Sequence, residues 1–184
     1  MPPSEIERDV ALRIKLIVLD VDGVLTDNGV YVGETEDGGY VELKRFNILD
    51  GLGIKLMRMA GLEVAFVSGR ISPASARRAK ELGVTCHQAD AGHKMEAVKQ
   101  LMDQHGVDWQ EIAWLGDDLP DLTGMRRAAL PVAVANAVAE IHAVSRWTTS
   151  HSGGDGAVRE FSEALLTARG QWKQLVDEYV AKRE

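Results

Sequence analysis

The feature that most constrains this chain is an aliphatic run that ends in two carboxylates one residue apart. Residues 14–19 are aliphatic except for one lysine, and Asp20 and Asp22 follow directly. A strand that is buried on both faces of a sheet has such a continuous apolar sequence, and ligands of open parallel sheets bind at the carboxyl ends of the strands. Together with Asp27, these acids repel one another unless a cation or a proton relieves them. The segment predicts a site for a hard divalent cation, with an Asx turn ended by Gly23 as the alternative.

Apolar runs of this kind recur along the chain, with helical patterns between them. The expected strands cover residues 14–20, 63–68, 84–87, 112–116 and 130–135. The expected helices cover residues 49–60, 73–82, 94–105, 119–128, 137–143, 157–169 and 171–182. This alternation predicts an α/β fold with a parallel sheet flanked by helices. At 184 residues, the chain is expected to form a single domain over residues 1–184.

Two segments have no obvious partner within such a fold. Residues 24–46 contain two short β-type sequences, 30–33 and 40–43, separated by a turn with Asp37-Gly38, which predicts a β-hairpin. A lone hairpin is only marginally stable in water, so we expect it to pair with a symmetry mate. The expected C-terminal helix, 171–182, packs either on its own chain or on a neighbouring subunit through an apolar stripe. The stripe consists of Trp172, Leu175, Val176, Tyr179 and Val180.

Composition excludes several classes of function. The net charge of −7 disfavours nucleic acid as a partner, because binding to a phosphate backbone needs clustered basic residues. No apolar stretch approaches the roughly 20 residues that span a membrane. Residues 1–9 are acidic and lack the apolar centre of a signal peptide, which predicts a cytoplasmic protein. Cys86, the only cysteine, is expected to be a small buried residue rather than a nucleophile.

Two further segments place phosphate-binding groups where a strand is expected to end or a helix to begin. Ser68, Gly69 and Arg70 follow the second strand, and a hydroxyl with backbone N–H groups binds phosphate oxygens well at such a position. Lys94 begins a helix, where its charge opposes the helix dipole unless an anion compensates for it. Taken alone, each has an ordinary alternative, a helix cap for the first and a surface lysine for the second.

The last of these segments is another strand that ends in acids. Asp117 and Asp118 follow the expected strand 112–116, and Asp121 comes shortly after them. Carboxylates at this strand end can reach the same crevice as the first acidic pair, giving a cage suited to Mg²⁺. The alternative for Asp118 and Asp121 is a place in the first turn of a helix.

The order of these segments resembles that of the haloacid dehalogenase-like phosphatases: D-x-D-G after a strand, S-G-R after a strand, a lysine that begins a helix, and G-D-D-x-x-D after a strand. Within that superfamily, D-V-D-G-V-L-T-D, the hairpin, F-N-I-L-D-G-L-G-I, V-A-V-A-N-A and G-G-D-G-A-V-R-E are similar to the 3-deoxy-D-manno-octulosonate 8-phosphate phosphatase family. The likeness extends over about residues 14–169. It implies a Rossmann-like sheet without a cap domain, a homotetramer, and Mg²⁺-dependent hydrolysis of a sugar-acid phosphate in lipopolysaccharide biosynthesis.

The resemblance also implies a role for each matching acid. Asp20 would be the nucleophile that forms an aspartyl-phosphate, and Asp22 would protonate the leaving alcohol and then activate water. Mg²⁺ would be held by the Asp20 carboxylate, the backbone carbonyl of Asp22, and Asp117. Asp118 and Asp121 would support these groups without touching the substrate.

The remaining matching residues would bind the substrate. Ser68, the Gly69 N–H group and Lys94 would hold the phosphoryl group. Arg70 would contact a carboxylate or hydroxyl of the sugar, with a solvated arginine as the alternative.

Two positions depart from the family pattern. Leu49 stands where an arginine is common in F-N-V-R-D-G, and Asp155 replaces the arginine of G-G-R-G. Each change removes a positive charge that could meet the sugar acid's carboxylate, so the sugar is less constrained than the reaction. The alternatives are a phosphatase of 2-keto-3-deoxynononate 9-phosphate, an open-site phosphatase of proteins, and a non-catalytic oligomerisation module. The retained carboxylates and lysine disfavour the module.

Overall fold

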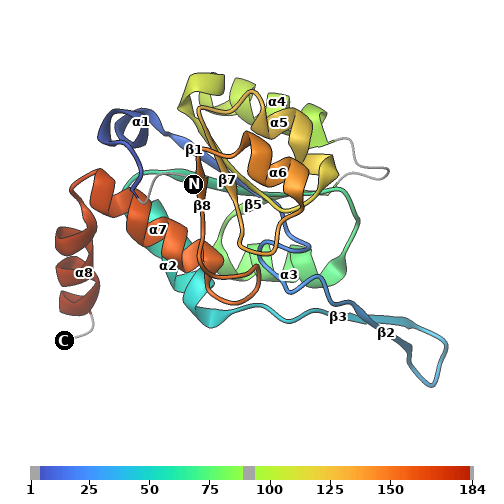
Figure 1. Ribbon diagram of the computed structural model, residues 1–184. Helices are drawn as coiled ribbons and strands as arrows, with labels where there is room; N and C mark the ends of the chain where they lie inside the picture. Colours follow the sequence, from blue (N-terminus) through green and yellow to red (C-terminus); the bar gives the residue numbers. More distant parts are fainter. Residues whose placement is uncertain (1–4, 89–93, 183–184) are drawn as a thin grey trace.

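A six-stranded parallel sheet forms the centre of the molecule, with helices on both faces (Figure 1). The computed structural model describes residues 5–88 and 94–182. The strand order is β5-β4-β1-β6-β7-β8, and every neighbouring pair is parallel. The strands are β1 (Leu16–Leu19), β4 (Glu63–Ser68), β5 (Thr85–Gln88), β6 (Ile112–Gly116), β7 (Leu130–Ala133) and β8 (Trp147–Thr148). The predicted α/β fold is therefore confirmed.

The order of the strands places a crevice beside β1. From β1 the chain goes to β4 and β5 on one side, and it then returns to β6 on the other side of β1. In open α/β sheets, ligands bind at such a reversal, outside the carboxyl ends of the strands. The acids after β1 and β6 lie at this reversal.

The helices cover the two faces of the sheet unequally. On one face lie α4 (Lys94–His105), α5 (Leu122–Met125) and α6 (Ala139–Val144) (Figure 1). The other face is covered by α2 (Ile48–Met59), α3 (Pro73–Leu82) and α7 (Ala157–Ala168), with α1 (Arg8–Arg13) and α8 (Trp172–Ala181) packed beside α7.

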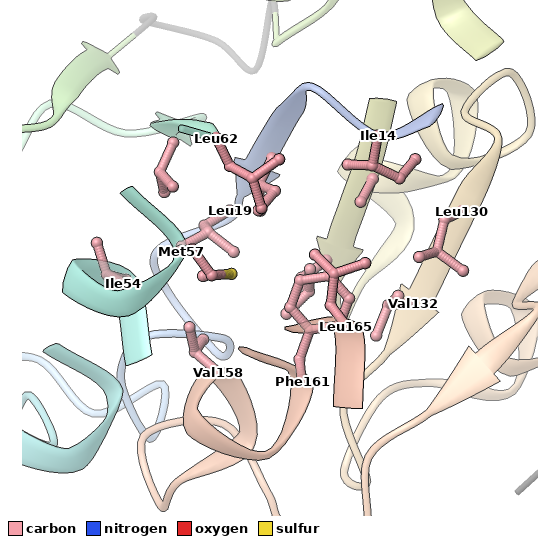
Figure 2. Packing of buried hydrophobic residues seen from close by; sticks show 14 of the residues in the cluster. Ile14, Leu19, Ile54, Met57, Leu62, Leu130, Val132, Val158, Phe161 and Leu165 are labelled. Carbon is pink, nitrogen blue, oxygen red and sulfur yellow. The ribbon is translucent and has the colours of Figure 1, made fainter. Parts of the chain in front are cut away.

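The residues of β1 alternate between two apolar clusters. Leu16 and Val18 pack toward α4 and α5, whereas Ile17 and Leu19 pack toward α2 and α7. Figure 2 shows the second cluster, in which Leu19 lies near Met57 of α2 while side chains of α7 close the cluster from below. Burying one large aliphatic side chain contributes about 1.5–3 kcal/mol, so this strand holds the sheet to both helix layers. This burial on two faces explains the continuous aliphatic sequence.

The predicted hairpin is present and projects from the body of the molecule (Figure 1). Strands β2 (Tyr31–Glu34) and β3 (Tyr40–Leu43) pair with each other in an antiparallel register. An isolated antiparallel bridge between Thr26 and Phe46 closes the base of the hairpin. The outer part is open to solvent: Tyr31 is 67% exposed, and Val32, Tyr40 and Leu43 are similarly open.

Some predicted elements differ from the structure. The helix expected over 119–128 is a 3₁₀ turn followed by the four-residue α5. Pro120 lies within the turn, and Gly124 packs so tightly that a Cβ there would meet the Trp114 ring at 2.1 Å. Strand β1 ends at Leu19, so Asp20 follows the strand rather than ending it. Helix α1 and strand β8 were not predicted, because six and two residues are too short to show periodicity.

The C-terminal helix packs on its own chain. Leu175 of α8 is buried, and Trp172 and Tyr179 pack against the cluster formed by α2 and α7. Only Val180 of the apolar stripe is largely exposed. Of the two alternatives for this helix, packing on its own chain accounts for these three residues of the stripe. No helix among residues 5–88 and 94–182 combines the length and hydrophobicity needed to cross a membrane.

Candidate active site

A cavity of about 240 Å³ opens where β1, β4 and β6 end and α4 begins. Every residue predicted for the site lines this cavity: Asp20, Asp22, Ser68, Gly69, Arg70, Lys94 and Asp117. Asn28, Asp118, Pro120 and Asp121 complete its walls. Segments almost a hundred residues apart in the sequence thus form one polar pocket.

Lys94 links two buried carboxylates at the bottom of this cavity. Its Nζ donates hydrogen bonds to Asp20 Oδ1 at 2.5 Å and to Asp121 Oδ1 at 2.9 Å. Burial alone would lower the pKa of Lys94, but the charges of Asp20 and Asp121 outweigh it and raise the pKa above its ordinary value. Lys94 is therefore a permanent cation beside Asp20, and the surface-lysine alternative is wrong.

Asp20 and Asp117 carry more negative charge than Lys94 can balance. Carboxylate oxygens of Asp20, Asp117 and Asp121 lie within 4.8 Å of one another. Burial raises the pKa of Asp20 well above its ordinary value, and Asp121 adds to the rise. Burial also raises the pKa of Asp117, although the hydrogen bond from Asn28 opposes it. Such a cluster is stabilised by a further cation.

Asp121 has its carboxylate oxygens occupied by the protein. Oδ1 accepts hydrogen bonds from Lys94 and from the Trp114 indole at 3.0 Å, and Oδ2 accepts one from the Asp117 backbone N–H at 3.3 Å. It therefore orients the lysine and the loop after β6. Asp118, by contrast, is exposed and caps the 3₁₀ turn by accepting from the Leu119 N–H group at 2.7 Å. Asp118 is thus the N-cap of the 3₁₀ turn, and the acid within that turn is Asp121.

The loop after β1 needs a glycine to approach Asp117. Gly23 has a φ of +99°, and a Cβ there would lie 2.0 Å from Asp117 Oδ2. Asn28, at a φ of +66°, donates from Nδ2 to that same oxygen at 3.1 Å. Sequence reasoning missed Asn28, although the Asp-Asn-Gly sequence at 27–29 is typical of a residue with positive φ.

Asp22 points toward the base of the hairpin. Its Oδ1 accepts a hydrogen bond from Lys44 Nζ at 2.6 Å, and Lys44 Nζ also lies 3.2 Å from Ser75 Oγ of α3. Lys44 follows β3 directly, so the hairpin brings it to the site. Nothing in its local sequence distinguishes it from a surface lysine.

The Ser68-Gly69-Arg70 loop is also tied to the hairpin. The Ser68 hydroxyl donates to the Arg70 carbonyl and accepts from the Arg70 N–H group, which fixes the turn. The Arg70 guanidinium donates to Glu42 of β3 at 2.8 Å, and Glu42 also accepts from the Ser72 hydroxyl. Arg70 lines the cavity while paired, so it is not simply a solvated arginine.

Leu49 and Asp155 lie away from the carboxylate cavity. Both line a second cavity of about 400 Å³ near the N-terminus of α7, together with Arg159. Asp155 Oδ1 lies 3.7 Å from an Arg45 nitrogen, so an arginine from the segment after β3 faces this acid. Cys86 is half-buried in β5, and burial raises the pKa of its thiol, as expected for a packing residue.

Comparisons with known proteins agree with this geometry. Residues 88–161 match the haloacid dehalogenase-like hydrolase family. The 3-deoxy-D-manno-octulosonate 8-phosphate phosphatase KdsC of Escherichia coli K12 is 37% identical over 161 residues, which cover 88% of this chain and 84% of that protein.

Two solved structures are similar over nearly the whole chain. The 3-deoxy-D-manno-octulosonate 8-phosphate phosphatase from Moraxella catarrhalis, in complex with a magnesium ion, a phosphate ion and KDO, has a TM-score of 0.85 and 35% identity, covering 94% of this chain and 97% of that one. The cobalt-bound phosphatase from Haemophilus influenzae has a TM-score of 0.80 and 36% identity, covering 89% and 93%. This chain is thus a phosphatase and belongs to the 3-deoxy-D-manno-octulosonate 8-phosphate phosphatase family of the haloacid dehalogenase-like hydrolases.

Proposed function

We propose that this protein hydrolyses 3-deoxy-D-manno-octulosonate 8-phosphate to the free sugar acid and phosphate, through an aspartyl-phosphate on Asp20. The observation that carries the proposal is the single cavity that brings Asp20, Asp22, Lys94 and Asp117 together. The names of the relatives support the choice of substrate.

The carboxylate cluster fits a divalent cation. The buried carboxylates of Asp20, Asp117 and Asp121 face one ammonium group, and burial raises the pKa of Asp20 and Asp117. Because Asp121 is occupied by protein donors, we assign Asp20, Asp117 and the backbone carbonyl of Asp22 as ligands of Mg²⁺. When bound, the cation supplies positive charge that stabilises the phosphoryl oxygens during transfer.

Asp20 is proposed as the nucleophile because it lies at the bottom of the cavity beside a fixed cation. One of its oxygens attacks phosphorus, and the bond from phosphorus to the sugar oxygen breaks. Asp22 gives its proton to that oxygen, so the sugar leaves as an alcohol. Water then attacks the phosphorus of the aspartyl-phosphate and passes a proton to Asp22, which releases phosphate and restores Asp20.

The remaining polar groups would hold the phosphoryl group during both displacements. Lys94 neutralises charge beside Asp20, while the Ser68 hydroxyl and the Gly69 N–H group lie on the wall of the same cavity. Phosphoryl transfer depends mainly on positioning and on charge neutralisation, which this set provides.

We further propose that the sugar is bound partly by a neighbouring subunit of a homotetramer. A cavity of about 240 Å³ is small compared with the roughly 300–1,000 Å³ of typical ligand pockets. It suits the phosphoryl group, and the eight-carbon acid would extend beyond it. The described residues between β4 and α4 form only α3 and β5, which leaves the sugar uncovered within one chain. The exposed apolar residues of the hairpin, Tyr31, Val32, Tyr40 and Leu43, provide a contact surface for assembly.

The proposal is tested by assaying the purified protein with Mg²⁺ against a set of sugar phosphates, with Asp20→Asn prepared in parallel to detect contaminating phosphatases. We expect the highest kcat/KM on the octulosonate 8-phosphate and none in the variant. A kcat/KM about 10-fold higher on the nine-carbon 2-keto-3-deoxynononate 9-phosphate, or on a hexose phosphate, would overturn the substrate assignment but not the reaction. Absence of phosphate release from every substrate would overturn both.

A further inference from the structure

We propose that Lys44 is a positioning residue that orients Asp22 for proton transfer, so that the hairpin helps to build the catalytic site of its own subunit. This inference rests on the proposed function, because it assumes that Asp22 is the general acid and base. It assigns a role to a hairpin residue that is not among the predicted site residues.

The environment of Lys44 is unusual for a lysine. Its side chain is 0% exposed, whereas lysines are almost never fully buried unless they are paired. Among the described residues, its Nζ donates hydrogen bonds to Asp22 Oδ1 at 2.6 Å and to Ser75 Oγ at 3.2 Å. A buried ammonium group with a close carboxylate partner is costly to disturb, because removing either member leaves the other charge poorly compensated.

This contact fixes one carboxyl oxygen of Asp22 and leaves the other for the substrate. A general acid works only when its proton lies within hydrogen-bond reach of the leaving oxygen. Asp22 lies at the edge of the cavity with one-quarter of its side chain exposed, so loss of the Lys44 contact should widen the range of orientations open to its carboxyl group. Lys44 holds Oδ1 in place, and the ammonium group lies next to the carboxylate that forms once the proton has left.

The hairpin holds Lys44 firmly enough for this role. Two residues earlier, in β3, Glu42 binds Arg70 and Ser72 of the loop after β4. Two residues later, Phe46 pairs with Thr26 of the loop after β1. The base of β3 therefore connects the loop that carries Asp22 with the loop that carries Arg70.

The test compares two kinds of leaving group in Lys44→Met, which keeps an unbranched side chain of similar length but lacks the charge. Because kcat/KM reports the steps up to departure of the leaving group, it isolates the step in which Asp22 acts as an acid. We expect kcat/KM to fall about 10- to 100-fold for the best alkyl phosphate of the wild type, which is part of the roughly 10²- to 10⁴-fold contribution of a general acid. For 4-nitrophenyl phosphate, whose phenolate leaves without a proton, we expect a loss below about 3-fold.

Three further variants separate positioning from structural damage. Arg45→Met removes a charge from the next residue, whose guanidinium faces Asp27 and Asp155 instead, and should keep the wild-type ratio of the two kcat/KM values. Ser75→Ala removes the other partner of Nζ and should shift the ratio in the same direction as Lys44→Met, but less. The double variant Asp22→Asn/Lys44→Met should be no slower than Asp22→Asn alone, because Lys44 acts through Asp22.

Each outcome decides the question. Equal losses on alkyl and aryl phosphates in Lys44→Met, or additive losses in the double variant, would overturn the positioning role while leaving the proposed function intact. If Lys44→Met does not fold, an unchanged ratio in Ser75→Ala overturns the role. If Asp22→Asn itself fails to discriminate between the two leaving groups, the acid assignment falls and the role of Lys44 falls with it.

Discussion

Strands β1 and β2 have the same length but opposite surroundings. All four residues of β1 are buried, with helices on both sides, whereas all four residues of β2 are exposed. The central sheet therefore derives its stability from one chain. The hairpin has its ladder of backbone hydrogen bonds, but β2 is exposed along its whole length and β3 is only partly covered, and a two-stranded sheet alone is marginal in water. The body alone can therefore place most of the residues that line the carboxylate cavity, while the hairpin reaches this cavity through its base.

The largest effect is expected within the body, from Asp20→Asn. The amide is nearly isosteric with the carboxylate but is a poor nucleophile, so kcat should fall more than about 100-fold on every substrate. Phosphate release measures the loss, and thermal unfolding serves as the control for an intact fold. A variant with more than about a hundredth of the wild-type kcat would show that Asp20 is not the nucleophile.

The sequence predicted the body well because its signals are local. A strand covered on both faces must be aliphatic, and each of the strands β1, β4 and β6 leads directly into polar residues at one edge of the sheet. The relative positions of Asp20, Ser68 and Asp117 follow from the parallel strand order alone. The prediction that Lys94 lies in the same site came from the family resemblance.

The residues that the sequence did not reveal act across the boundary between body and hairpin. Lys44 and Glu42 are separated from their partners, Asp22 and Arg70, by more than twenty residues, and no periodicity connects them. The prediction of one helix over 119–128 was wrong for a similar reason, because the close contact of Gly124 with the Trp114 ring depends on tertiary packing. Contacts of this kind need the folded chain.

The second largest effect is expected from removing the cation. Chelation with EDTA should remove activity and Mg²⁺ should restore it, because the buried carboxylates would otherwise repel the phosphoryl oxygens. Asp117→Ala should raise the Mg²⁺ concentration needed for half-maximal activity by about 10- to 100-fold. The control is Asp108→Ala, whose exposed side chain caps the 3₁₀ turn Trp109–Glu111 outside the cavity and should leave this requirement unchanged. Full turnover after chelation would contradict the metal site.

A smaller effect on activity is expected from a substitution in the hairpin, because it acts through assembly rather than on the reacting groups. Val32→Glu places a charge on an exposed apolar strand and should reduce assembly, as measured by light scattering. If a neighbour covers the sugar, kcat/KM should fall about 10-fold for the octulosonate 8-phosphate and little for 4-nitrophenyl phosphate. The matched control is Glu36→Gln in the exposed turn of the hairpin. A fully active monomer, or equal losses of kcat/KM on both substrates, would contradict the proposal that assembly through the hairpin helps to bind the sugar.

The smallest effect concerns Asp50, a polar residue that joins α2 to α7 inside the body. Its side chain is buried, Oδ1 accepts a hydrogen bond from the Arg159 N–H group at 2.8 Å, and Oδ2 has no hydrogen-bond partner among the described residues. Asp50→Ala leaves that N–H group without its acceptor and should lower the free energy of unfolding by about 1–3 kcal/mol. Activity should change little, because Asp50 does not line the carboxylate cavity.

Asp50→Asn provides the sharper test, because it keeps the acceptor and removes the charge. Burial raises the pKa of Asp50 above its ordinary value, so the folded state favours the protonated form. The stability that this residue contributes is fully present below the ordinary pKa of about 3.9 and is lost as the pH rises through the raised value of the folded state. Urea unfolding of both proteins should therefore show the wild type losing stability relative to Asp50→Asn as the pH rises above about 4. The difference in unfolding free energy between the two proteins could instead stay constant with pH or change in the opposite direction. Either result would mean that the N–H groups at the start of α7 compensate for the buried charge of Asp50. An ionised acid would then cost no more inside the body than on the exposed hairpin.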